Sequence, residues 1–70
     1  MKIKANDLSF ISERGLNVSA EDELDIKIVN HSYIEIFKDG VRIDAFPAER
    51  SQLIEINIFE LNKFLESENK

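Results

Sequence analysis

The chain has 70 residues, of which 43% are hydrophobic and 33% are charged, and its formal net charge is −5. A chain of this length forms one small domain, residues 1–70, and we expect its tail to be loose after about residue 66. The negative charge argues against direct nucleic-acid binding, which depends on cationic surfaces. The sequence contains no cysteine, so disulfides and thiolate metal sites are excluded.

No stretch of the sequence has the apolar length of a secretory signal or of a membrane-spanning helix. We therefore expect a protein without membrane contact. The lack of cysteine is typical of a reducing compartment and predicts a cytoplasmic location, or the host cytoplasm if a phage encodes the protein.

The N-terminal segment predicts a short helix. Asp7 is placed to cap it, Leu8, Phe10 and Ile11 form its apolar side, and Gly15 is placed to end it. A strand through residues 16–18 is the competing interpretation after Gly15.

The middle of the chain predicts β-strands. Leu24, Ile26 and Ile28 alternate with polar residues, which indicates a half-buried strand, and the sequence NHS at 30–32 predicts a turn.

The sequence YIEIFKDGVRIDAF, residues 33–46, predicts a β-hairpin with a two-residue turn at Asp39 and Gly40. This turn implies a register in which Glu35 lies opposite Asp44. One face of the hairpin is then apolar and core-facing: Ile34, Ile36, Val41, Ile43 and Ala45.

After Pro47, the sequence LIEI at 53–56 predicts a fourth strand, and Asn57 followed by Glu60 predicts the capping box of a helix. The expected apolar side of that helix comprises Ile58, Leu61, Phe64 and Leu65. The fold class that results is α+β: an antiparallel meander of three to four strands with a C-terminal helix packed on one face and a short N-terminal helix.

The second face of the hairpin is the candidate protein-binding site, because Tyr, Phe and Arg are common in binding hot spots. Its residues are Tyr33, Glu35, Phe37, Arg42, Asp44 and Phe46. The alternative is that residues 8–11 fold over this face and make it an inner layer.

A second candidate site is an acidic patch at residues 21–25, which is suited to a basic partner surface or to mimicry of nucleic acid. Its carboxylates belong to Glu21, Asp22, Glu23 and Asp25. The alternative interpretation of the patch is an ordinary solvated strand entry.

Catalytic chemistry has little support. His31 is the single histidine, and its neighbour Ser32 points the other way on an extended chain, so we predict no triad, metal or cofactor site. A minimal enzyme using Glu35 and Asp44 as paired carboxylates is the weakest hypothesis.

The leading hypothesis is a non-enzymatic, small acidic module that binds another protein or a protein–nucleic-acid complex, with a homodimer as a companion expectation. Its size and charge suggest a phage or mobile-element inhibitor of a host protein, of the anti-defence type. The alternative is an antitoxin-like or regulatory subunit that acts through a protein partner.

Overall fold

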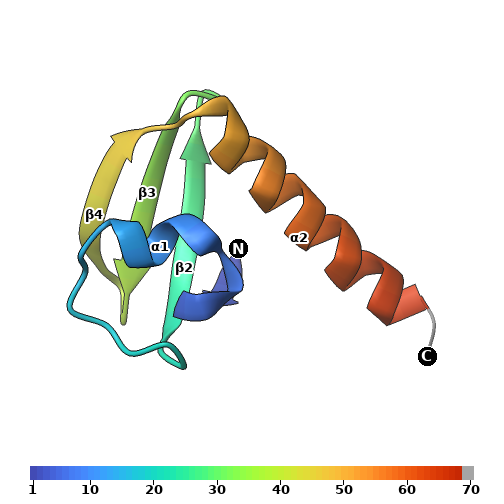
Figure 1. The fold of residues 1–70 in the computed structure, drawn as a ribbon, viewed down its shortest axis with the longest axis horizontal. Coiled ribbons are helices and arrows are strands. Elements are labelled where there is room, and N and C mark those ends of the chain that lie inside the picture. Colours follow the sequence, from blue (N-terminus) through green and yellow to red (C-terminus); the bar gives the residue numbers. More distant parts are fainter. Residues whose placement is uncertain (69–70) are drawn as a thin grey trace.

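The computed structural model describes residues 1–68, which form a four-stranded antiparallel sheet and two α-helices (Figure 1). The strands lie side by side in chain order: β1 (Lys2–Lys4), β2 (Glu23–Val29), β3 (Tyr33–Lys38) and β4 (Val41–Pro47). A 3-10 turn (Ala5–Asp7) and helix α1 (Ser9–Glu13) follow β1, and helix α2 (Arg50–Glu68) follows β4. The predicted α+β class with an antiparallel meander is confirmed.

Helix α2 continues through Glu68, and the rest of the predicted loose tail lies outside the described residues. Within residues 1–68, neither helix combines the length and the apolar composition needed to cross a membrane.

The hydrophobic core lies between one face of the sheet, here called the core face, and the N-terminal segment. Strands β2 and β3 turn alternate residues toward it, because side chains in a strand alternate between faces. Residues 8–11 cover this face, not the opposite one, so the predicted alternative of a covered second face is wrong (Figure 1). The buried residues are Ile3, Ala5, Leu8, Phe10, Ile11, Leu24, Ile26, Ile34, Ile36, Phe46 and Ile56.

The predicted hairpin turn is confirmed. Asp39 and Gly40 have φ angles of 52° and 81°, and positive φ at both central residues is what a type I′ turn requires. Next to the turn, Phe37 pairs with Arg42, as the two-residue loop implies. The predicted turn at residues 30–32 is also present between β2 and β3.

Farther from the turn, the predicted register is wrong. A shift between Ile36 and Phe37 inserts one extra residue into β4, so Ile36 pairs with Asp44 and Ile34 with Phe46. A shift of one residue moves each later side chain to the other face of the strand. Phe46 therefore points into the core, with 5% of its surface exposed, whereas Val41 and Ile43 remain exposed.

The predicted strand at 53–56 is wrong, because this segment is the beginning of α2. The Glu49 backbone N–H donates to Oε1 of Gln52 at 2.8 Å, which is one half of a capping box and starts the helix well before Asn57. The two-residue step from Ile54 to Ile56 suggested a strand, but Leu53 and Ile56 are three residues apart, which is the spacing of one helix face. The fourth strand of the sheet is instead β1.

Helix α1 lies where the sequence predicts it, and Gly15 follows it with a φ of 67°. Asp7 is not its cap, since its carboxylate accepts the Lys4 backbone N–H at 2.7 Å. The side chain of Glu55, from α2, accepts hydrogen bonds from the backbone N–H and the hydroxyl of Ser9 at 2.6 and 2.7 Å. This contact ties the first half of α2 to the start of α1.

The second half of α2 extends away from the sheet (Figure 1). In the first half, Ile56 is fully buried in the core and Phe59 packs against it. Beyond Phe59, every described residue of the helix is exposed, including Leu61, Phe64 and Leu65. The described part of the chain therefore leaves much of α2 without contacts from its own domain.

Candidate protein-binding surface

The candidate surface is the sheet face opposite the core, here called the outer face. Cross-strand partners share a face, so the pairing of the strands defines it. Strand β3 turns Tyr33, Glu35 and Phe37 toward this face, because Ile34 and Ile36 between them point into the core. Its residues on the three long strands are Glu23, Asp25, Lys27, Val29, Tyr33, Glu35, Phe37, Arg42, Ala45 and Pro47.

Aromatic and charged side chains contact each other across the outer face. Arg42 NH1 lies 3.0 Å from Glu35 Oε2, and Lys27 Nζ lies 4.8 Å from the centre of the Phe37 ring. Lys27 therefore covers this aromatic ring. Tyr33 keeps 41% of its surface exposed beside Val29, which keeps 39%. Neither helix covers these residues within the described part of the chain.

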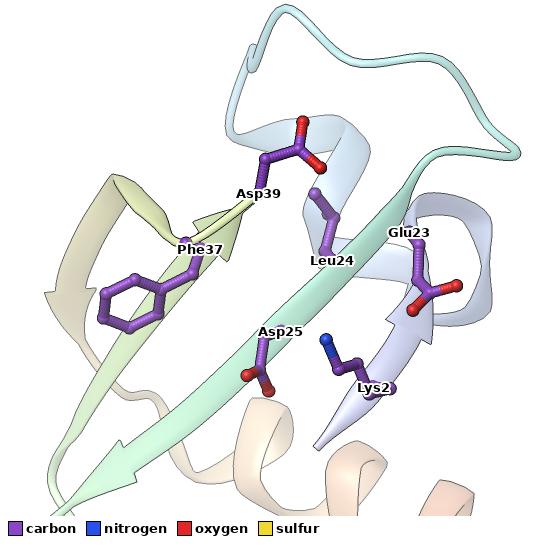
Figure 2. A pocket seen from close by; sticks show the side chains of 7 residues that line it. Lys2, Glu23, Leu24, Asp25, Phe37 and Asp39 are labelled. Carbon is purple, nitrogen blue, oxygen red and sulfur yellow. The ribbon is translucent and has the colours of Figure 1, made fainter.

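A hollow of about 350 Å³ opens where β1, β2 and β3 meet. Figure 2 shows Lys2, Asp25 and Phe37 on neighbouring strands around it, with the helices behind the sheet. Glu23 and Asp39 add two more carboxylates to the lining. The lining thus combines three carboxylates, an aromatic ring and the Lys2 ammonium, and one of the carboxylates, Asp25, is paired with the Met1 amino group.

Four of the six predicted hairpin residues are together on the outer face: Tyr33, Glu35, Phe37 and Arg42. The other two, Asp44 and Phe46, lie on the core face, so their predicted placement beside the first four is wrong. The physical reason is the extra residue in β4. Glu35 pairs with Ala45 and not with Asp44, so the carboxylate pair on which the enzyme hypothesis rested does not form.

Asp44 is held by Arg14, which follows α1. The Arg14 guanidinium donates from Nε to Oδ2 at 2.7 Å and from NH2 to Oδ1 at 3.1 Å, and it lies 4.0 Å from the centre of the Phe46 ring. Phe46 also makes an edge contact with Phe10, with 6.1 Å between ring centres. Sequence reasoning missed Arg14, because nothing in the local pattern links it to a strand 30 residues away.

The predicted acidic patch is largely paired with cations of its own chain. Glu21 lies 3.0 Å from Lys4 Nζ, Asp22 lies 3.2 Å from Lys38 Nζ, and Asp25 accepts from the Met1 amino group at 2.9 Å. The Ser19 backbone N–H and Lys38 lower the pKa of Asp22, and the Met1 amino group lowers the pKa of Asp25. These pairs reduce the net negative field that the patch presents to a partner.

Among residues 1–68, no three His, Asp or Glu side chains are close enough to share a metal ion. His31 lies exposed in the turn between β2 and β3, with a φ of 59°.

The hydrogen bond from Arg14 lowers the pKa of Asp44 below its ordinary value, although partial burial acts in the opposite direction. A carboxyl whose pKa is lower in the folded state stabilises the fold fully above its unfolded-state pKa. That contribution is lost as the pH falls through the folded-state pKa.

We expect Asp44→Asn to lower the free energy of unfolding by about 1 kcal/mol at pH 7. The difference from wild type should shrink below about pH 4, where the wild-type carboxyl also loses its charge. Urea unfolding followed by circular dichroism at pH 7, 4 and 3 measures this. The control is Glu60→Gln, which removes one charge at an exposed position of α2. It should lower the free energy of unfolding by less than about 0.5 kcal/mol at pH 7. A difference for Asp44→Asn that stays constant from pH 7 to 3 would contradict the role of the ion pair.

Comparisons with protein-family models, with curated proteins and with solved structures found no match to this chain.

Proposed function

We propose that this protein is a non-enzymatic module that binds another protein through its outer face. The observation that carries the proposal is the exposure of Tyr33 and Arg42 on a sheet face that neither helix covers within residues 1–68. Exposed Tyr and Arg side chains, flanked by a partly covered Phe37, have the composition of an interface hot spot.

The hollow beside Phe37 supports a basic or neutral partner. It is lined by the carboxylates of Glu23, Asp25 and Asp39, and the whole chain carries a net charge of −5. Asp25 is paired with the Met1 amino group and Lys27 lies against the Phe37 ring, but Glu23 and Asp39 form no ion pair within residues 1–68. A Lys or Arg side chain of the partner would gain contacts with these two carboxylates. The net negative charge of the chain speeds its association with a cationic surface.

The narrower hypotheses concern the role of this binding. An inhibitor of a host protein, encoded by a phage or another mobile element, is the form suggested by size and charge. Mimicry of nucleic acid receives less support, because Glu21, Asp22 and Asp25 are paired with cations of the same chain. An antitoxin-like or regulatory subunit would use the same face for a different partner.

The test is affinity capture from a lysate of the cells in which the gene occurs, with the immobilised full-length protein as bait. We expect the double variant Tyr33→Ser, Arg42→Ser to retain at least ten-fold less of a captured protein than wild type, because each side chain is a hot-spot type. Mass spectrometry with isotope-labelled standards measures the ratio.

The matched control is Val41→Ser, which alters a side chain that is 63% exposed on the same hairpin. This variant should capture as much as wild type, and circular dichroism should show all three proteins folded. A captured protein that the double variant retains as well as wild type would place the binding surface elsewhere and remove the proposal.

A further inference from the structure

Helix α2 carries a second apolar side that residues 1–68 leave about half exposed. Ile54, Ile58, Leu61 and Leu65 are spaced by four, three and four residues and are each about half exposed, at 49%, 54%, 55% and 48%. At 3.6 residues per turn they fall within roughly 60° of one another. We call these four residues the outer stripe of α2.

The outer stripe lies on the side of α2 opposite its anchor. Ile56 is completely buried in the core, and the helical repeat places the centre of the stripe roughly 170° around the helix from it. The helix therefore cannot bury the stripe against its own sheet while Ile56 stays in place. Sequence reasoning missed the full stripe because it assigned Ile54 to a strand. The four-residue step from Ile54 to Ile58 was the signal for a longer helix.

The surface area of the chain indicates a missing contact. It exposes 5050 Å², whereas a folded monomer of 8.1 kDa exposes roughly 4,500 Å². An excess of roughly 500 Å² per copy amounts to roughly 1,000 Å² in a pair, which is the lower limit for a specific interface.

The spacing of the outer stripe allows two copies of α2 to pack against each other. Alternating steps of three and four residues form the seam by which two helices pack side by side, with each apolar side chain between those of the other helix. In an antiparallel alignment, Ile54 of one copy lies opposite Leu65 of the other, and Ile58 lies opposite Leu61. The exposed Phe64 borders this seam.

The charges on α2 favour the antiparallel direction. Arg50 stands at the N-terminal end, and Glu66 and Glu68 stand near the other end. Antiparallel pairing brings Arg50 of one copy beside these glutamates of the second. The positive end of each helix dipole then lies beside the negative end of the other, which is favourable. Parallel pairing would place the acidic ends together. Because each domain sits at the N-terminal end of its helix, antiparallel pairing also keeps the two sheets apart (Figure 1).

We propose that a second copy of this chain occupies the outer stripe, forming a homodimer through antiparallel α2 helices. This proposal is independent of partner binding by the outer face, because the two surfaces share no residue.

The first test is sedimentation equilibrium of the full chain over micromolar to millimolar concentrations. We expect a reversible dimer for wild type and a dissociation constant at least ten-fold weaker for Ile58→Glu, which buries a charge in the seam. Val41→Glu adds the same charge at an exposed apolar residue of the hairpin and should dimerise as wild type does. A wild-type monomer throughout, or a dimer that Ile58→Glu leaves unchanged, would overturn the proposal.

The second test shows whether the two α2 helices pair antiparallel or parallel, and it does not depend on the folding of a charged variant. The chain has no cysteine, so single replacements report one position each. Mixing Ile54→Cys with Leu65→Cys should give a mixed dimer with a short thiol cross-linker. Either protein alone should cross-link at least ten-fold more slowly. Rapid cross-linking of Leu65→Cys to itself would overturn the antiparallel arrangement.

Discussion

Replacing Phe46 with alanine is expected to lower the free energy of unfolding by about 3 to 5 kcal/mol. The ring is 5% exposed, packs edge-on against Phe10 and lies beneath the Arg14 guanidinium. A 70-residue domain has a total stability of only a few kcal/mol, so this variant should be largely unfolded at 25 °C. Circular dichroism during urea titration measures the loss.

The control for this prediction is Tyr33→Ala on the same hairpin. Tyr33 is 41% exposed on the outer face, so its removal should cost about 1 kcal/mol or less and leave the protein folded. The sequence placed Tyr33 and Phe46 on the same face of the hairpin. Comparing the two variants therefore shows which of these side chains lies in the core. Equal losses for Tyr33→Ala and Phe46→Ala would mean that the bulge in β4 is not present in solution.

The second large effect concerns the attachment of α2. Ile56→Ala is expected to cost about 2 to 5 kcal/mol, because Ile56 is the one fully buried residue in the described part of α2. Most of the stability of a helix in a protein comes from the tertiary packing of its apolar face. We therefore expect the helical signal near 222 nm to fall with the rest of the structure in a thermal or urea titration.

Ile58→Ala is the matched control, since it removes the same atoms two residues farther along the helix. Ile58 is 54% exposed, so at concentrations that keep the chain monomeric its loss should cost about 1 kcal/mol or less. A larger loss for Ile58→Ala than for Ile56→Ala would show that α2 packs on the sheet through the other side.

Local signals in the sequence accounted for much of the fold. The alternation of Leu24 and Ile26 predicted β2, the pair Asp39 and Gly40 predicted the turn with positive φ, and Gly15 predicted the end of α1. Each of these features depends on neighbouring residues in the chain, such as a two-residue period or a backbone conformation that few residues adopt. The α+β class followed from these signals together with the apolar spacing of the C-terminal helix.

For the candidate site, the sequence placed Tyr33, Glu35, Phe37 and Arg42 on one face, and the structure brings these four together. It misplaced Asp44 and Phe46, because the pattern of residues 41–46 fits a regular hairpin as well as a bulged one. The register depended on distant groups: Phe46 packs with Phe10, and Asp44 binds Arg14.

The sequence by itself determined the turns, the alternating strands and the apolar spacing within α2, because those properties arise between residues close together in the chain. Only the tertiary structure decided which apolar side of each element is buried. Ile56 and Ile58 are the same residue type two positions apart, yet one is in the core and the other is in solvent. The contacts that separate them come from β-strands and from α1, and no local pattern encodes where those elements meet.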